Sequence, residues 1–314
     1  MTPMVNALTI DFEDWFQVTS LERFIAYPAW PGCEVRLHES TDRLLRVLRE
    51  TETRATFFVL GWNADRFPDL VKRVLDAGHE IGSHGYRHQV VYSLSPGQFR
   101  EDLARSMEAI DRVTGGPPVG YRAPSFSIVG RSAWALEVLR ELGLGLDSSV
   151  VPARHHRYGI PHAPRYPYRI VLNGSGALAE APISTLAMPG TNLVVSGGAY
   201  FRLLAYPAIR WAVRWLNGLG QPAVFYLHPW ELDPGIPRYP LPPMLRLLSY
   251  ANLQTTEDKL RRLLREFKFA PLGEVIRDRA AELPRVPVEF LSRTTDPCPI
   301  PSHGVGGAVP TGGA

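Results

Sequence analysis

Cysteine is nearly absent from this chain of 314 residues. Its two cysteines, Cys33 and Cys298, lie far apart in the sequence. A small secreted domain held together by disulfides carries a closely spaced, even set of cysteines, so that class of protein is excluded. Two unpaired thiols are typical of a reducing compartment. We therefore expect a hydrophobic core, and not disulfides, to stabilise the fold.

Long apolar runs are missing as well. No stretch approaches the roughly 20 apolar residues that a helix needs to cross a bilayer. The first six residues lack the basic and apolar regions of a secretion signal. These two absences predict a cytoplasmic protein without an integral membrane segment.

Charge of one sign is not in excess either. The formal net charge is +3, and no block of Lys and Arg stands out, so nucleic acid is not an expected partner. With 45% hydrophobic and 21% charged residues, the composition is that of an ordinary globular protein. The length allows one large domain or two small ones.

Three carboxylates stand at the end of the first apolar segment. Residues 7–15 read Ala-Leu-Thr-Ile-Asp-Phe-Glu-Asp-Trp, so a predicted buried strand runs directly into Asp11, Glu13 and Asp14. Carboxylates at the carboxyl end of a buried strand suit metal binding or proton transfer better than they suit packing. This segment is therefore the starting point for a candidate site.

Strand and helix patterns alternate from here to about residue 227. Short β-branched or aromatic segments end near residues 60, 84, 122, 147 and 227. Amphipathic segments separate them, and we expect the first of these helices to be capped by Ser40 or Thr41. Alternation of this kind predicts parallel strands with crossover helices, an α/β fold of the (β/α) barrel type. In such a barrel, functional side chains gather at the carboxyl ends of the strands.

The last part of the chain is less regular. Residues 151–168 have the composition of a long loop, and the proline-rich residues 233–243 precede a final amphipathic helix that we expect to begin at Thr255. Beyond residue 283 the periodicity fades. We therefore expect one domain over residues 1–283, with its core motifs at 9–228 and a helical extension at 229–283, and a disordered tail at 284–314.

One aspartate and two histidines form a compact set of metal ligands in this sequence. Asp14, His84 and His88 offer one hard oxygen and two imidazole nitrogens, which suit zinc, with cobalt, nickel, manganese or iron as rivals. Glu13 beside them is a candidate general base, and His228 a candidate acid. Each residue alone also fits a purely structural role, and their joint occurrence at successive strand ends favours a site.

Other histidines fit a site less well. His79-Glu80 is followed by its next histidine five positions on, so the zinc-protease pattern HExxH is not met. His155, His156 and His162 fall in the long loop, where exposed side chains are favoured over a second metal site. We therefore assign these residues no catalytic role.

The motifs, taken in order, resemble those of the polysaccharide deacetylases of carbohydrate esterase family 4, the NodB-homology proteins. Asp11-Phe12-Glu13-Asp14-Trp15 resembles the first motif, in which two adjacent acids are base and metal ligand. His84-Gly85-Tyr86-Arg87-His88 is similar to the second, which supplies two further metal ligands. The segment 121–126 is similar to the third, in which an arginine orients the base and a backbone N–H just after a proline binds the oxyanion.

The fourth and fifth motifs are matched more loosely, by residues 146–149 and 226–228. The resemblance implies that Asp147 tunes His228, which protonates the leaving group. It also implies that Arg122 orients the base and that the Ser125 N–H is the oxyanion donor. Glutamate at the base position and Trp15 in place of a glycine are departures, and they leave open whether Glu13 or Asp11 is the base.

The family resemblance implies a distorted barrel of about seven strands and a metal-dependent hydrolase that removes N-acetyl groups from the amino sugars of a glycan. Segments 11–16, 228–234 and 252–264 look like the subgroup tied to exosortase (PEP-CTERM) and exopolysaccharide gene clusters, which points to exopolysaccharide biosynthesis. Trp15, Tyr121 and Trp230 are candidates for stacking on sugar rings. Two alternatives stay open: a metal-dependent amidase on small amides, and a non-catalytic glycan-binding protein.

Overall fold

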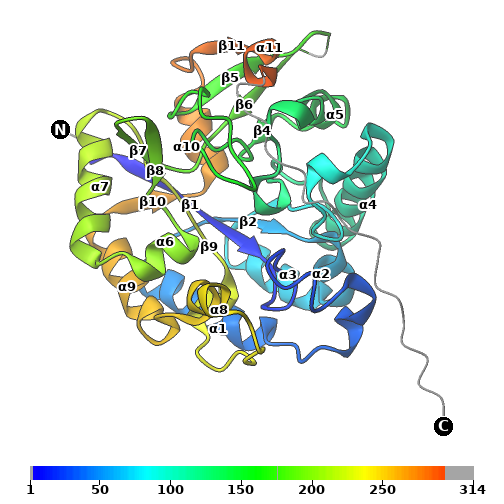
Figure 1. Ribbon diagram of the computed structural model, residues 1–314, viewed down its shortest axis with the longest axis vertical. Coiled ribbons are helices and arrows are strands. Elements are labelled where there is room, and N and C mark those ends of the chain that lie inside the picture. The colour runs from blue at the N-terminus through cyan, green and yellow to red at the C-terminus, as the bar shows by residue number, and fades with distance from the viewer. Residues whose placement is uncertain (1–2, 175, 294–314) are drawn as a thin grey trace.

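The computed structural model describes residues 3–174 and 176–293 (Figure 1). The part of the expected disordered tail at 294–314 lies outside the described residues. Within the described part, none of the helices is both long and apolar enough to cross a membrane.

A buried parallel sheet forms the centre of the molecule. Strand β1 (Val5–Phe12) is exposed at its first residue and buried along the rest. It pairs in parallel with β2 (Thr56–Val59), β9 (Val224–Leu227) and β10 (Lys268–Ala270), and β2 pairs in parallel with β3 (Glu80–Ser83). Strands covered on both faces are apolar along their length, which is why the first segment of the sequence has so few polar residues before its acids.

The sheet continues beyond β3 through one residue. Tyr121 bridges in parallel to Ser83 on one side and to Asp147 on the other. Asp147 belongs to β4 (Leu146–Asp147), which pairs in parallel with β6 (Ala177–Glu180). The strand that the sequence predicts at 119–122 is therefore a single bridge. It nevertheless keeps Arg122 at the same edge of the sheet as His84.

Two further strands follow β6. Strand β5 (Tyr168–Val171) is antiparallel to β6 and pairs in parallel with β11 (Arg285–Pro287), which leads into helix α11 (Val288–Ser292). Residues 285–292, expected in the tail, are thus part of the folded structure, and Leu291 is fully buried. Strands β7 (Thr185–Met188) and β8 (Thr191–Val194) form a separate hairpin.

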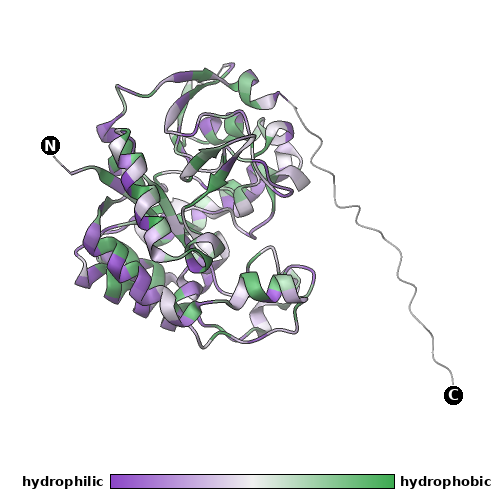
Figure 2. Ribbon diagram, turned by 60° about the vertical axis from the view of Figure 1, so that its left-hand side comes forward, coloured by the Kyte–Doolittle hydropathy of each residue, from purple (hydrophilic) through white to green (hydrophobic). Residues whose placement is uncertain are grey.

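Helices surround the strands (Figures 1 and 2), and among the described residues each α-helix except α8 has buried residues. The α-helices before β6 are α1 (Leu37–Glu50), α2 (Gly61–Arg66), α3 (Pro68–Asp76), α4 (Pro96–Thr114) and α5 (Ala135–Glu141). Those after β8 are α6 (Gly198–Leu203), α7 (Tyr206–Gly218), α8 (Pro243–Tyr250), α9 (Leu253–Glu266) and α10 (Leu272–Asp278). Helix α8 begins at the last proline of the proline-rich stretch and was not predicted.

The predicted α/β class with parallel strands is confirmed. The strand pairs of the described residues run as an open series and do not form a closed barrel. The segment after β6 nevertheless approaches β9, where the Ser184 N–H donates to the Val224 carbonyl at 3.1 Å. The carboxyl ends of the parallel strands therefore point to one region of the molecule.

The start of α1 differs from the prediction. The helix begins at Leu37, and Ser40 lies inside it, where its hydroxyl donates to the Arg36 carbonyl at 2.6 Å. The Asp14 carboxylate accepts instead from the N–H groups of Arg36 and Leu37, at 2.8 and 2.9 Å. A side chain from another segment thus caps this helix, so local sequence could not reveal it.

Candidate active site

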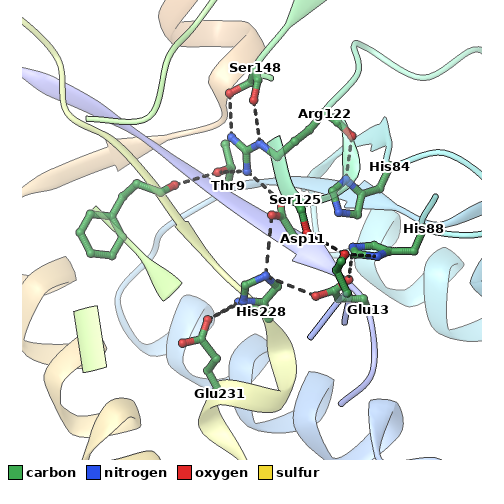
Figure 3. A network of polar contacts seen from close by, with 12 residues as sticks. Thr9, Asp11, Glu13, His84, His88, Arg122, Ser125, Ser148, His228 and Glu231 are labelled. Carbon is green, nitrogen blue, oxygen red and sulfur yellow. Dashed lines mark hydrogen bonds and ion pairs between the residues drawn. The ribbon is translucent and has the colours of Figure 1, made fainter. Parts of the chain in front are cut away.

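Polar side chains from the ends of three parallel strands meet in one cavity of about 330 Å³ (Figure 3). Asp11 and Glu13 come from the end of β1, His84 and His88 from the turn after β3, and His228 follows β9. Because parallel strands end on the same side of a sheet, these residues meet although they are far apart in the sequence. The distances between their side chains indicate the chemistry that each can perform.

Three of these side chains form a group that suits a metal. Among the described residues, the group with His, Cys, Asp or Glu ligand atoms all within 4.8 Å of one another is Glu13, His84 and His88. All three are buried, and the Glu13 Oε2 atom lies 2.8 Å from His88 Nε2 without a donor in hydrogen-bonding geometry. Two imidazole nitrogens and one carboxylate oxygen are a donor set that fits zinc and similar divalent metals.

The protonation of His84 also fits this role. Its Nδ1 lies 2.7 Å from the Arg122 carbonyl, which can only accept, so Nδ1 carries the proton and Nε2 keeps its lone pair. Burial, together with the nearby His88, lowers the pKa of His84 to about 3, so the imidazole is neutral. A second hydrogen bond that fixes the tautomer is typical of metal-binding histidines.

The charge of Glu13 is compatible with a ligand as well. Burial alone would raise the pKa of its carboxyl, but the adjacent His88, His228 and His84 together hold that pKa below its usual value. Glu13 is therefore an anion that can bind a cation.

Asp14, expected as a metal ligand, lies elsewhere. Besides capping α1, its carboxylate accepts from the Trp15 N–H at 2.8 Å. Burial raises the pKa of Asp14 to about 7, against the lowering effect of these backbone hydrogen bonds. Consecutive residues at a strand end point to opposite sides, whereas Asp11 and Glu13, two apart, share one side. The structure therefore brings Glu13, and not Asp14, together with the two histidines.

Arg122 contacts Asp11 and not Glu13. Its Nη1 donates to Asp11 Oδ1 and to Thr9 Oγ1, both at 2.7 Å, and its Nη2 donates to Ser148 Oγ at 2.8 Å. The guanidinium is fully buried and lies over the Phe58 ring at 4.4 Å. One oxygen of Asp11 is thus fixed, and its other oxygen lies 3.9 Å from His228 Nε2.

His228 has a different partner from the expected one. Its Nδ1 lies 2.6 Å from Glu231 Oε1, and Glu231 Oε2 accepts from Arg202 Nε at 2.7 Å. Burial would lower the pKa of His228, but Glu231 and Glu13 raise it to about 9. Its Nε2 lies 3.3 Å from Glu13 Oε1. His228 is therefore cationic at neutral pH and presents an N–H to the cavity.

Asp147, expected to tune His228, is fully buried in another network. It accepts from Ser149 Oγ at 2.5 Å, and Ser149 Oγ in turn accepts from the Ala123 N–H at 2.8 Å. Burial raises the pKa of Asp147, and burial together with the nearby Asp147 carboxyl raises the pKa of Glu180 well above its usual value. Through Ser149, Asp147 therefore supports the backbone of Ala123, the residue that follows Arg122.

The expected substrate residues are divided between the cavity and the core. Ser125 lines the cavity, has a positive φ of 52°, and its hydroxyl lies 2.7 Å from Thr19 Oγ1. Trp230 also lines the cavity and stacks on His228, with ring centroids 5.3 Å apart. Trp15 is buried, and its Nε1 donates to the Glu34 carbonyl at 2.9 Å. Tyr121 is buried against Phe99 and does not line the cavity.

The long loop expected at 151–168 contributes to the cavity wall. His155 stacks on Tyr158 with centroids 3.9 Å apart, and both line the cavity together with His156 and Tyr200. His162 lies outside the cavity, where its Nε2 is 2.7 Å from the Phe290 carbonyl. This region, whose role the sequence left open, thus lines part of the same cavity as Glu13, His84 and His88.

Sequence reasoning missed Glu231 and Arg202. A signal for Glu231 was present, since it follows His228 by three residues with Pro229 between them, a pattern that favours a tight helical turn. That turn, residues Pro229–Leu232, brings the two side chains together. Arg202 had no such signal, because it comes from another segment.

Two family models match adjacent parts of the chain. Residues 29–145 match the model described as polysaccharide deacetylase, and residues 148–277 match a domain of unknown function, DUF3473. Strand β4 lies in the short gap between the two matched segments. His228, Glu231 and Arg202 therefore lie in the second part, and His84 and His88 in the first.

Curated relatives are similar over about a third of the chain. A peptidoglycan-N-acetylglucosamine deacetylase of Bacillus cereus is 35% identical over 100 residues, which are 32% of this chain and 36% of that protein. A peptidoglycan deacetylase of Helicobacter pylori is 38% identical over 109 residues, 35% of this chain and 36% of the other. The chain thus spans little more than a third of the length of these relatives.

Solved structures share the fold over most of the chain. The crystal structure of a protein from Mycobacterium smegmatis, whose title names a polysaccharide deacetylase, has a TM-score of 0.58 at 23% identity and covers 91% of this chain and 98% of its own. An allantoinase has a TM-score of 0.56 at 16% identity, covering 89% and 91%. At these identities the likeness establishes the fold alone. The family models add that residues 29–145 are similar to the polysaccharide deacetylase family and that residues 148–277 are similar to DUF3473.

Proposed function

We propose that this protein is a metal-dependent deacetylase that hydrolyses the N-acetyl groups of amino sugars in a glycan. The observation that carries the proposal is the convergence of Glu13, His84 and His88 with Asp11 and His228 on one cavity. A metal-binding group, an acid and a base within one cavity are what amide hydrolysis needs.

Glu13, His84 and His88 would hold the metal, most plainly zinc, with cobalt, nickel, manganese and iron as alternatives. When bound, a divalent metal activates a water molecule and polarises the amide carbonyl. This assignment replaces Asp14 by Glu13, since the Asp14 carboxylate is occupied by three backbone N–H groups.

Asp11 is the proposed general base. Arg122 binds one of its oxygens, so the other is oriented and can accept a proton from water as the water oxygen attacks the amide carbon. Arg122 is then the positioning residue for Asp11. The Ser125 N–H remains the proposed donor to the oxyanion, because Ser125 lines the same cavity.

His228 is the proposed general acid. Glu231 holds its Nδ1 and raises its pKa to about 9, so its Nε2–H is present at neutral pH and faces Glu13 and Asp11. When the carbon–nitrogen bond breaks, this proton passes to the departing amine. Acetate and a free amino sugar result. Trp230, stacked on His228, supports its orientation and offers an aromatic surface to the sugar.

The substrate class follows from the relatives. Two of them are named as deacetylases of peptidoglycan, one of these specifically of its N-acetylglucosamine, so an N-acetylated amino sugar in a glycan is the proposed substrate. Exopolysaccharide biosynthesis is the proposed process, carried by the sequence motifs described above. The cytoplasmic location remains a prediction.

The test is acetate release by the purified full chain from chitin oligomers and from an N-acetylated exopolysaccharide. We expect release that a chelator abolishes and that added zinc or cobalt restores. His84→Gln should remove both activity and bound metal, whereas His38→Gln, at an exposed histidine, should leave both unchanged. Absence of release on every glycan despite stoichiometric bound metal would contradict the proposal.

A further inference from the structure

An apolar stripe lies on the outer side of α8. Met244, Leu247 and Leu248 are spaced as residues on one helical face, and 68%, 51% and 37% of their surfaces are exposed. No residue of α8 is buried. A surface helix normally turns its apolar side toward the core, so this exposed stripe indicates a contact with something outside the chain.

This stripe is continuous with the active-site cavity. Leu203, at the end of α6, is 41% exposed and lines the cavity together with Leu245 and Leu248 of α8. Helices α6 and α8 lie side by side (Figure 1), and Arg202 ties them by donating to the carbonyls of Leu248 and Ala251. The cavity thus runs from the polar group around His84 to an apolar rim that is open to solvent.

The chain segments that carry the exposed leucines and Met244 contain no acidic residues. The sequence contains no Asp or Glu between Glu180 and Glu231, and none between Asp233 and Glu257. Glu231 and Asp233 themselves are buried and paired with arginines. On the rim side, Arg238 and Arg246 are exposed. Exposed leucine and methionine flanked by arginines, with no acid among them, are complementary to an anionic lipid surface.

We propose that the α8 surface, made of Leu203, Met244, Arg246, Leu247 and Leu248, docks on an anionic bilayer, and that the cavity receives a saccharide carried on a lipid. The apolar rim would lie in the interface with the lipid part of the substrate, and the sugar would reach the group around His84. The substrate part rests on the proposed deacetylase function, but the docking part does not.

The first experiment measures docking without catalysis. The full chain is sedimented with phosphatidylcholine vesicles, with and without phosphatidylglycerol. We expect binding to the vesicles that contain phosphatidylglycerol, weakened by salt, and a drop of about tenfold for Met244→Ser/Leu247→Ser. Arg246→Gln should reduce the dependence on phosphatidylglycerol.

The matched control is Met188→Ser/Leu193→Ser on the β7–β8 hairpin, where both residues are exposed and neither lines the cavity. This variant should bind vesicles as the wild type does, and thermal melting of all variants checks folding. Equal vesicle binding by the α8 variant and the wild type, or no binding by either, would overturn the proposal. A concentration-dependent dimer that the α8 variant abolishes, with no vesicle binding, would assign the surface to a second copy.

The second experiment compares acetate release from one N-acetylated oligosaccharide, free in solution or attached to a lipid in vesicles. We expect faster turnover of the lipid-attached form, and we expect the α8 variant to lose this advantage. Vesicle binding without any acetate release would contradict the deacetylase function and leave docking intact. Equal acetate release from the free and the lipid-attached oligosaccharide would contradict the lipid-carried substrate and leave the deacetylase function intact.

Discussion

Residues 5–147 and residues 148–277 supply different parts of the site. The first part provides the metal-binding group, Asp11 and Arg122, all buried and fixed by strand ends or by backbone contacts. The second part provides His228, its partner Glu231 and most of the cavity wall. The boundary coincides with the limit between the two matched family models. The first part thus carries the group that suits a metal, of which His84 and His88 lie within the segment matched at 29–145 and Glu13 precedes it. The second part adds His228 and lines most of the cavity.

The acid is the point at which the two parts differ most from the family pattern. The resemblance implies that a strand-end aspartate in the first part, Asp147, tunes the histidine of the second part. In the structure Asp147 accepts a hydrogen bond from Ser149, and the carboxylate that contacts His228 is Glu231, three residues further along the same turn. The second part therefore contains the whole chain of contacts behind the proposed acid, in which Arg202 donates to Glu231 and Glu231 contacts His228.

The largest effect is expected at Asp11, in the first part. Asp11→Asn keeps the shape but removes the proton acceptor, so turnover should fall by about 10²- to 10⁴-fold. Bound metal should remain stoichiometric, because Asp11 is outside the group of three ligands. Acetate release and elemental analysis measure the two quantities. Loss of metal together with activity would contradict the division of roles between Asp11 and Glu13.

A smaller loss of turnover is expected for Glu231→Gln, and it should exceed the loss for Asp147→Asn. Glu231→Gln removes the charge that holds His228 protonated, and we expect turnover to fall about 10- to 100-fold. Asp147→Asn leaves the His228–Glu231 contact intact and should cost much less turnover. Melting temperatures are needed for both variants, since Glu231→Gln also leaves Arg202 buried without its anion. A larger loss of turnover in Asp147→Asn, at equal stability, would restore the expected family pattern.

The smallest effect on chemistry is expected at Asp14. Asp14→Ala removes the acceptor for the Arg36 and Leu37 N–H groups at the start of α1 and for the Trp15 N–H, so we expect about 1 to 2 kcal/mol lower stability. Turnover per folded molecule should hardly change. Denaturant unfolding and acetate release measure the two effects. A folded Asp14→Ala protein without activity would show that Asp14 takes part in the reaction.

Much of the first part could be predicted from the sequence. The apolar segment before Asp11, the histidine pair after β3 and the position of Arg122 after a strand all follow from strand periodicity and parallel topology. The choice between Glu13 and Asp14 did not follow from the motif, because two adjacent acids face opposite sides of a strand end. Alternation along β1 places Asp11 and Glu13 on the same side, so it would have favoured a site with both residues. Asp11 was the alternative to Glu13 that the sequence left open for the base.

The contacts in the second part were harder to predict from the sequence, for physical reasons. Arg202 and Glu231 meet through a contact between distant segments, and the α1 cap by Asp14 is likewise non-local. Helix α8 follows a proline-rich stretch and buries none of its residues, so it had no core-facing pattern to detect. Local patterns therefore predicted the strand ends and missed the contacts between segments.

The most direct test of the central claim is the metal content of Glu13→Gln and Asp14→Asn, measured side by side after reconstitution with zinc. The account predicts that Glu13→Gln loses most of its bound metal, because it removes one of three ligands, whereas Asp14→Asn binds metal as the wild type does. Full metal in Glu13→Gln, with loss in a folded Asp14→Asn protein, would contradict the proposed site.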